Sequence, residues 1–477
     1  MKKLLYILVF NLLFILNTNA QNFKFDHNWV ISYNPNFGNL FNFNGDSLKI
    51  EKMNKKIALG FGGNTISNKD GHLLYYTNGC EINDTSQQAI KNGSGLTESK
   101  LKSQCAYGID IMQMSTFLTF ETSDTLLFIQ CDLNDDYKGR YVRLYHISMK
   151  QNAVFQKETI IDDYIMKGMK AIKHSNGKDW WLIVNETNYK YYYAILITKN
   201  GVASVTKYNY PKEGLYNLGA GQVAASLDGK KYATVDYVNQ LRVYDFDRCS
   251  GKLTNELNLP FEKFLEQDPT SVCFSPNNRF LYASTSDSLF QYDLQAPNVA
   301  KSRIVIDVLD KNFKDGALPL YFYLMEQGPD GRIYMCCSTG VKYMHFINKP
   351  NEKGKACDFR QHGITLDYYS DNVPNLANHR LGKAAVVCST ASEEVAGVEK
   401  VLVYPNPSHD QVFVQNLQNE AGTLSVYNSV GQPVYTQRFQ DNQLQQIDVN
   451  NYPSGYYILE ISYDNRERES RGFVVGR

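Results

Sequence analysis

The chain has 477 residues, and its 49 Lys and Arg are balanced by 49 Asp and Glu, so the formal net charge at pH 7 is zero. This balance excludes the strongly basic surface of a typical nucleic-acid-binding domain, and no nucleic-acid partner is expected. The length allows a large core and more than one domain, and the 34 Tyr and 25 Phe favour strands over helices.

Residues 1–20 have the layout of a secretory signal peptide. A short basic head precedes an apolar stretch at residues 4–16, and small residues lead up to Ala20. We expect cleavage between Ala20 and Gln21 and export of the remaining chain. Export permits disulfides to form.

Nine cysteines follow this segment, so at least one thiol stays unpaired within a monomer. Cys131, Cys273 and Cys336 lie in apolar strand patterns and are expected to be buried thiols. Cys249 and Cys357 lie in polar, turn-like contexts and are expected to form disulfides, with partners that the sequence leaves open. No Cys-x-x-Cys pair indicates a zinc site, and no metal or cofactor is expected.

One pattern recurs along most of the chain: a strand, a turn built on Asp or Asn, and another strand. Its turn residues are spaced by 54, 52, 52, 49 and 53 positions: Asp70, Asp124, Asn176, Asp228, Asn277 and Asp330. Gly follows in several of these turns, as in two-residue hairpins, because Gly tolerates positive φ. A regular period near 50 is typical of a β-propeller.

The propeller is expected to cover residues 21–388, which is enough chain for about seven units of this period. Because only six hairpins are visible, seven blades are favoured and six remain the alternative. The remaining blade is expected to be shared between the two ends of the region. In that arrangement residues 384–387 pair with strands near Trp29 and close the ring.

Several phrases resemble secreted β-propellers of the WD40-like or YVTN-like kind that precede type IX secretion signals: residues 65–79, 246–253, 328–334, 347–351 and 374–382. This resemblance covers most of residues 25–385. It implies a propeller fold and an exported location. It carries no shared catalytic motif.

A linker is predicted at residues 389–399, which are small, acidic and without periodicity. Short strand patterns then recur through residues 400–477 and predict a small β-sandwich. The expected fold is therefore all-β, a propeller followed by a C-terminal sandwich.

The C-terminal segment resembles the type IX (Por) C-terminal sorting domain. Its motif residues lie in the opening segment, the central hairpin and the last turn: Tyr404, Pro405, Asn406, Pro407, Gly431 and Gly455. Both glycines are expected to serve turns that need positive φ. The resemblance implies recognition by the type IX secretion machinery, removal of the domain by its sortase, and attachment of the cargo to surface lipopolysaccharide.

Other patterns favour structural explanations over chemistry. Residues 132–136 resemble half of a calcium loop, but Tyr137 and Arg143 stand where Gly and Glu are needed, so a solvated connection is preferred. Eight histidines are scattered without ligand spacing, and surface positions are preferred for His72 and His174. The aromatic stripe at residues 188–193 suits sugar stacking, although packing between blades explains it with fewer assumptions.

Three Asp-Ser/Thr-Leu phrases are similar to the O-glycosylation acceptor pattern of bacteria that use type IX export. Their hydroxyl residues are Ser47, Thr125 and Ser288. All three are expected at junctions between a turn and a strand, where such residues are common without modification.

The sequence favours an exported, cell-surface or secreted propeller that binds a glycan or a protein, delivered by a removable sorting domain. No catalytic residue is identified. The alternative is a lactonase-like hydrolase or lyase with a site in the central channel. His, Asp and Glu clustered at one channel mouth would favour the enzyme, whereas aromatic, Asn and Ser side chains would favour binding.

Overall fold

The computed structural model describes most of the chain beyond residue 22. The described residues are 23–97, 100–109, 111–121, 123–133, 139–186, 191–211, 221–236, 240–259, 271–310, 320–384, 388, 401–416, 421–428, 431–440, 444–464 and 468–476. The predicted signal peptide, with Ala20 and Gln21, and the predicted linker lie outside them.

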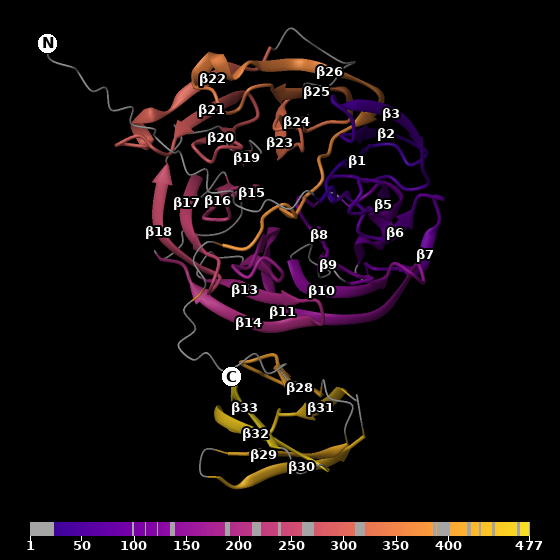
Figure 1. Cartoon of the computed structure of the whole chain (residues 1–477), viewed down its shortest axis with the longest axis vertical. Coiled ribbons are helices and arrows are strands. Elements are labelled where there is room, and N and C mark those ends of the chain that lie inside the picture. The colour runs from indigo at the N-terminus through magenta and orange to yellow at the C-terminus, as the bar shows by residue number, and fades with distance from the viewer. Residues whose placement is uncertain are drawn as a thin grey trace, which may run out of the picture.

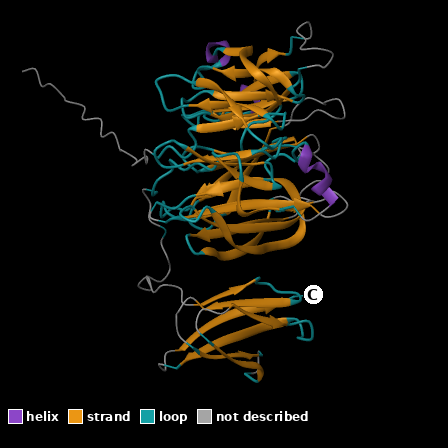
Figure 2. Cartoon of the chain, turned by 90° about the vertical axis from the view of Figure 1, so that its right-hand side faces the viewer, coloured by secondary structure: helices purple, strands orange, loops and turns teal. Residues whose placement is uncertain are grey.

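Strands make up nearly all of the regular structure (Figure 2). The described helices are three short 3-10 helices: η1 (Lys100–Ala106), η2 (Ala300–Ser302) and η3 (Gly354–Cys357). Within the described chain, no helix has the length and apolar character to cross a membrane. The all-β expectation is confirmed.

The first strands form a three-stranded antiparallel sheet of β1 (Asn28–Ile31), β2 (Phe37–Asn42) and β3 (Lys49–Asn54). An 11-stranded sheet follows: β4 (Asn64–Ser67), β5 (Leu73–Thr77), β6 (Glu81–Asp84), β7 (Ala89–Ser94), β8 (Ser115–Leu118), β9 (Thr125–Leu133), β10 (Gly139–Ser148), β11 (Ala153–Lys173), β12 (Trp180–Glu186), β13 (Tyr191–Thr198) and β14 (Gly201–Asn209).

The long strand β11 joins two sets of strands within this sheet. Its first part, from Ala153 to Ile165, pairs with β10, and its second part, from Ile165 to Lys173, pairs with β12. It therefore ends one antiparallel set, β8 to β11, and begins the next, β11 to β14. The strands β4 to β7 form a third set, which meets β11 at Lys91 and Ala153.

Three separate four-stranded sheets complete the ring in Figure 1. They are β15 (Val223–Ala225), β16 (Lys231–Asp236), β17 (Gln240–Asp247) and β18 (Lys252–Leu259); β19 (Ser271–Phe274), β20 (Phe280–Ser284), β21 (Ser288–Asp293) and β22 (Ile304–Val308); and β23 (Phe322–Gln327), β24 (Ile333–Cys337), β25 (Val341–Ile347) and β26 (Phe359–Ser370). The described strands of the ring thus fall into seven successive sets, three of which share one sheet.

Aromatic side chains fill the space between neighbouring sets. Tyr192 on β13, Tyr232 on β16 and Tyr244 on β17 are fully buried in one cluster, together with Trp181. Burying an aromatic or large aliphatic side chain contributes about 1.5–3 kcal/mol, so these contacts hold adjacent sets together. Tyr192, from the aromatic stripe, packs between sets as expected; residues 188–190 of the stripe lie outside the described chain.

All six predicted turns connect the first two strands of a set. The same bond recurs in them: the amide of Gly71 donates to Asn68 O, that of Gly229 to Ser226 O, and that of Gly331 to Gly328 O. These glycines have φ of +91°, +66° and +80°. The loops are longer than the expected two-residue hairpins, because residues 68–72, 226–230 and 328–332 all lie between the strands.

The expected ring closure is wrong. Ala384 donates its amide to Ser175 O, in the turn between β11 and β12, and does not pair with a strand near Trp29. Among the described strands, the first sheet consists of β1, β2 and β3, and it meets the last blade where Tyr33 N donates to Tyr369 O. Residues 385–387 lie outside the described chain.

Two disulfides are formed, Cys80–Cys105 and Cys249–Cys388. The expectation for Cys249 is confirmed, and that for Cys357 is wrong, because Cys357 is buried beside Tyr282 outside both disulfides. The predicted buried thiols Cys131, Cys273 and Cys336 are indeed buried and outside the disulfides: apolar strand positions hold them in the core.

The C-terminal strands form a separate body of two sheets with a shared core, which fits the expected sandwich (Figure 1). One sheet has β27 (Val401–Tyr404), β28 (Gln411–Asn416) and β31 (Leu444–Asp448). The other has β30 (Pro433–Phe439), β29 (Gly422–Tyr427), β32 (Gly455–Tyr463) and β33 (Arg468–Val475).

Candidate functional site

The centre of the propeller is occupied by the chain itself. After β26, residues 371–384 run through the middle of the ring without forming a strand and turn at His379 and Arg380 (Figure 1), and we call this segment the channel strap. Near the start of the strap, Asn372 Oδ1 accepts a hydrogen bond from Ser32 N at 3.0 Å. At its end, Ala384 N donates a hydrogen bond to Ser175 O. Residues 371–377 are all buried, so the strap is part of the core.

Asn375 joins the strap to the inner strands of several sets. Its side-chain amide donates to Ser115 O at 3.1 Å and to Met169 O at 3.0 Å. Its backbone carbonyl accepts from Asn64 Nδ2 at 2.9 Å, and Gln113 Nε2 lies 3.3 Å from its Oδ1. The strap therefore satisfies the buried backbone carbonyls of Ser115 and Met169, as buried polar groups require.

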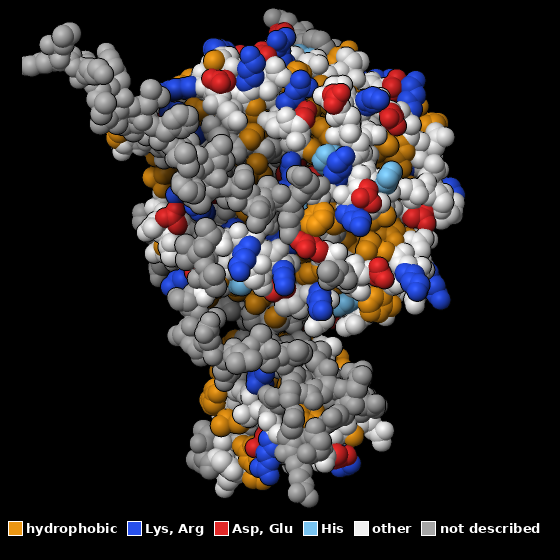
Figure 3. Space-filling view, viewed as in Figure 1, with side chains coloured by type: hydrophobic (Ala, Val, Ile, Leu, Met, Phe, Trp, Pro, Cys, Tyr) orange, Lys and Arg blue, Asp and Glu red, His pale blue; other side chains and the backbone are white. Residues whose placement is uncertain are grey.

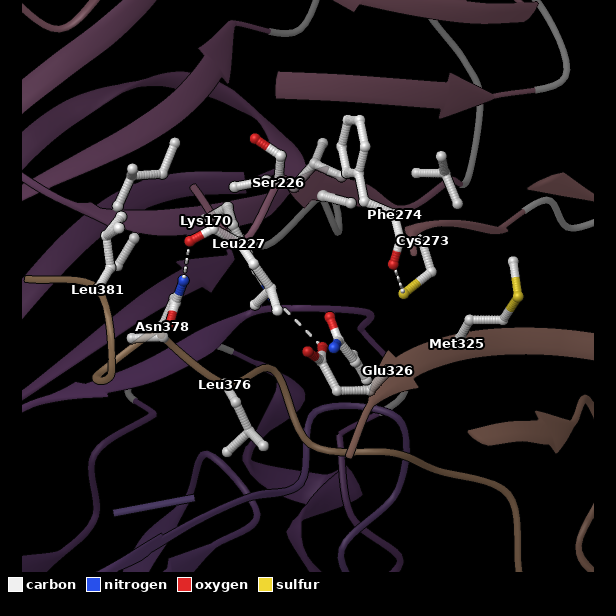
Figure 4. A pocket seen from close by; sticks show the side chains of 18 of the residues that line it. Lys170, Ser226, Leu227, Cys273, Phe274, Met325, Glu326, Leu376, Asn378 and Leu381 are labelled. Atoms are coloured by element: carbon white, nitrogen blue, oxygen red, sulfur yellow. Dashed lines mark hydrogen bonds and ion pairs between the residues drawn. The ribbon is translucent and has the colours of Figure 1, made fainter. Parts of the chain in front are cut away.

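A buried ion pair lies beside Asn375. Lys170 Nζ is 3.2 Å from Glu326 Oε2 and 3.4 Å from Asn375 Oδ1, and Figure 4 shows Lys170 and Glu326 pointing toward one another. Burial raises the pKa of Glu326, against the opposing effect of Lys170. Carboxylate and amide oxygens are ligands that a hard cation prefers, but here the lysine ammonium takes that position.

Next to this pair is a cavity of about 50 Å³, lined by Ser226, Cys273, Leu376 and Asn378 among others (Figure 4). It has room for a few water molecules. At the same mouth of the channel, Arg380 Nη2 lies 2.8 Å from Asp26 Oδ2. Both carboxylates at this mouth, Asp26 and Glu326, are thus paired with cations.

A larger groove of about 720 Å³ opens where the strap leaves the ring. Turn residues Asp228, Lys230 and Pro276 line it together with Leu381 and Lys383 of the strap. Its volume lies in the range of small-molecule sites. Lys230 and Lys383 are exposed there, so the groove offers cationic groups next to apolar surface.

Arg248 and a disulfide hold the strap at this groove. Arg248 donates from Nε to Lys173 O at 2.8 Å and from Nη2 to Gly382 O at 2.6 Å. The next residue along the chain, Cys249, forms a disulfide with Cys388. The end of the propeller is therefore fixed before the predicted linker begins.

In the last blade, His345 lies beside both a cysteine and a second histidine. Its Nδ1 accepts the amide hydrogen of His362 at 3.1 Å, so the ring hydrogen lies on Nε2, which is 3.3 Å from Cys337 Sγ. Burial lowers the pKa of His345 to about 3. A neutral ring that already carries hydrogen on this nitrogen cannot take the thiol proton, so the pair is structural. Among the described residues, no group of three or more His, Cys, Asp or Glu could hold a metal.

The remaining sequence candidates are distributed over the surface and core. His72 is exposed, as expected, whereas His174 is half-buried against Trp181. Asp132 is buried and paired with Arg143 at 2.8 Å; residues 134–136 of the calcium-like phrase lie outside the described chain.

The three hydroxyl residues of the acceptor pattern stand at junctions between a turn and a strand. Ser47 is exposed just before β3, while Thr125 and Ser288 are the half-buried first residues of β9 and β21. Ser288 Oγ donates to Asp287 Oδ1 at 3.0 Å, as expected for an unmodified turn residue. Ser47 is thus the most accessible of the three for a modifying enzyme.

The opening motif of the C-terminal body is anchored on its last strand. Asn406 donates from Nδ2 to Gly472 O at 3.2 Å and accepts from Val474 N at 2.8 Å through Oδ1. The neighbouring bonds Tyr404–Pro405 and Asn406–Pro407 are cis. The motif thus connects the first and last strands of the body.

The two motif glycines differ in conformation. Gly431 has a φ of +79°, as expected for its turn. The expectation for Gly455 is wrong: this residue opens β32 and is not among the glycines with positive φ. Both face open space, where an added Cβ would meet no atom within 4 Å.

Sequence reasoning missed the role of residues 371–384. Pro374 and Asn375 lie in a stretch without strand alternation, within the phrase 374–382 that carries the propeller resemblance. Its buried Asn residues replace the strand pairing that was expected to close the ring. A single sequence offers no signal for such a path, because each of its hydrogen-bond partners is distant along the chain.

Comparisons of the chain as a whole give distant structural similarities. No curated protein matches the chain in sequence. Among solved structures, hydrazine synthase of Kuenenia stuttgartiensis aligns at 13% identity over 76% of this chain and 92% of that one, with a TM-score of 0.36. A functionally unknown protein of Desulfotomaculum acetoxidans aligns at 10% identity over 73% and 99%, with a TM-score of 0.38. Neither similarity carries an argument about function.

Residues 402–475 match the family described as the secretion system C-terminal sorting domain. This range coincides with the two C-terminal sheets and includes the whole motif from Tyr404 to Gly455. The chain is therefore a β-propeller protein that ends in a type IX (Por) secretion sorting domain, which sends it to the cell surface or outside the cell.

Proposed function

We propose that the mature chain is a binding or scaffold module at the cell surface. The observation that carries this proposal is the channel strap: Asn375 and its neighbours occupy the centre of the ring, where a lactonase-like enzyme would place its site. Ligands then contact the faces of the propeller and the groove beside Leu381. Figure 3 shows Lys and Arg interspersed with Asp and Glu over the described surface, as expected for a module without a dominant charge.

The proposal includes the processing steps. The signal peptide is removed between Ala20 and Gln21, the sortase removes the sorting domain, and the new C-terminus is attached to surface lipopolysaccharide. The fixed position of Cys388 supports this order of parts, because the disulfide with Cys249 ties down the propeller's end upstream of the linker. Loss of residues 401–477 therefore leaves the ring and its strap complete.

The test uses the processed protein recovered from cells. It is incubated with extracellular polysaccharides and with outer-membrane proteins from the producing cells, and both retention and product formation are measured. We expect retention of at least one ligand, which is then released chemically unchanged. Steady product formation that Asn375→Asp or Glu326→Gln abolishes would instead support a channel enzyme.

A further inference from the structure

Exposed aromatic side chains gather where the first sheet meets the last blade. Tyr33, Phe37 and Tyr369 have 50%, 42% and 46% of their surface exposed. With Tyr368 we call them the aromatic platform. Exposed apolar groups that occur singly need no explanation, whereas a cluster of them marks an interaction site.

Backbone and ring contacts bring the platform together. Tyr33 N donates to Tyr369 O at 2.8 Å, which places the β1–β2 loop against the end of β26. The rings of Phe37 and Tyr368 are stacked, with centroids 5.1 Å apart and an interplanar angle of 11°. The Tyr33 ring lies over Gly340, where an added Cβ would be 2.9 Å from its Cγ.

The loop that carries Tyr33 and Phe37 is held from beneath. Lys55, only 3% exposed, donates from Nζ to the carbonyls of Asn34 and Ile57. Ser32 Oγ lies 2.8 Å from both Asn34 O and Phe37 O. The two rings are therefore presented on a preorganised loop, which lowers the entropy cost of binding.

The chemistry of the platform fits an uncharged, hydroxyl-rich partner. Tyrosine offers an apolar face and a polar hydroxyl, and Asn34 and Asn36 are exposed on the same loop. The nearby charges are engaged: Lys52 lies 3.2 Å from Asp367, and Lys342 Nζ lies 5.2 Å from the centroid of the Tyr369 ring. A partner without charge complements this surface better than an acidic or basic one.

The two ends of the propeller's chain lie on the face of the ring opposite to the aromatic platform. β1 starts at Asn28, which bonds Ser67 and Gly71 beside the β4–β5 turn, and ends next to Tyr33. Lys24 is bonded to Lys69 in that same turn. The strap begins beside Tyr369 and ends at the β11–β12 turn, which is the equivalent turn of another set. The platform therefore faces away from the exit toward the sorting domain.

We propose that the aromatic platform binds a neutral polysaccharide by stacking sugar rings on Tyr33, Phe37 and Tyr369. The proposal rests on the binding-module function and assigns its ligand class and its contact surface. In the alternative outcomes, the same rings pack against a second copy of the chain or against a protein partner. The test below separates these outcomes from sugar binding.

The experiment is affinity gel electrophoresis of the processed protein in laminarin, amylopectin, glucomannan and xylan, with alginate as an acidic comparison. We expect retardation by at least one of the neutral polysaccharides. Tyr33→Ala, Phe37→Ala and Tyr369→Ala should each weaken it about tenfold, whereas Tyr33→Phe keeps the ring and should stay within about threefold. Phe155→Ala, which removes an aromatic ring 53% exposed on β11, is the matched control and should change little.

Three results would overturn the proposal. The first is no retardation by any of the neutral polysaccharides, and the second is retardation that survives the platform substitutions. The third is a dimer, seen by size-exclusion chromatography, that these substitutions dissociate. If alginate or a protein is retained and no neutral polysaccharide is, the binding-module function stands while this proposal fails. Thermal unfolding of each variant shows whether its fold is intact.

Discussion

Lys170 and Glu326 form an ion pair inside the channel, with 3.2 Å between Nζ and Oε2. Lys170 stands on β11 and Glu326 on β23, so the pair joins two sets that are distant in sequence. Their side chains are 9% and 12% exposed. Removing one partner of a buried pair leaves the other charge unpaired, which costs more than the pair itself contributes.

Lys170→Met should therefore lower the free energy of unfolding by about 3–5 kcal/mol. The double variant Lys170→Met/Glu326→Leu should recover most of this loss, because no unpaired charge remains. Urea unfolding of the single and double variants measures the coupling. Lys52→Met, which breaks the exposed pair with Asp367, serves as the control and should cost less than about 1 kcal/mol. A double variant no more stable than Lys170→Met would contradict this explanation.

Lys55 should contribute stability that rises with pH between pH 7 and 9. Burial lowers the pKa of Lys55 from 10.5 to about 7 in the folded chain. Between these values the unfolded chain binds more protons than the folded one, so raising the pH favours folding by up to about 1.4 kcal/mol per unit for this group. Lys173, whose pKa is also lowered to about 7 by burial, acts in the same direction.

Lys55→Met should flatten this pH dependence, as measured by urea unfolding at several pH values from 7 to 9. The exposed Lys52→Met is again the control and should keep the wild-type slope. The account of Lys55 fails if both variants show the same slope as the wild type.

The two motif glycines provide a matched pair. An added Cβ meets no atom at either position, so only the backbone conformation differs. Gly431→Ala should destabilise the sorting domain by about 1–2 kcal/mol because its φ is +79°. Gly455→Ala should be neutral or stabilise it by up to about 1 kcal/mol. Hydrogen exchange of β29 and β32 in the full-length chain measures both effects. Equal losses of protection in the two variants would show that φ does not decide the loss of stability.

The disulfides predict a defined peptide map. Non-reducing digestion should yield Cys80 linked to Cys105 and Cys249 linked to Cys388. Cys388→Ser should release the end of the strap and increase proteolysis beyond Gly382, because the hydrogen bonds to Arg248 and Ser175 then hold it without a covalent link. Cleavage at an unchanged rate would mean that the disulfide does not hold the strap.

The sequence predicts repeated local features well. The turns at Gly71, Gly229 and Gly331 follow from neighbouring residues, because positive φ is a local requirement that Gly meets. The opening motif at Asn406 is local in the same way, because a short phrase of adjacent residues defines it.

Features that depend on distant partners could not be predicted. Asn375 gives no local sign that it bonds Ser115 and Met169, more than 200 residues away. Cys249 and Cys357 were both expected to form disulfides, but only the path of the strap brings a partner, Cys388, to Cys249. The aromatic platform was missed for the same reason, since Tyr33 and Tyr369 meet only when the first sheet lies beside the last blade.

The central claim is that residues 401–477 are a removable export signal on a complete propeller. Intact-mass spectrometry of the protein recovered from the cell surface, beside fractionation of a strain that lacks this segment, tests it most directly. The account predicts a surface form that begins at Gln21 and ends between Cys388 and Val401, and a truncated form that stays folded in the periplasm. A surface form that extends to Arg477, or a truncated form that still reaches the surface, would contradict it.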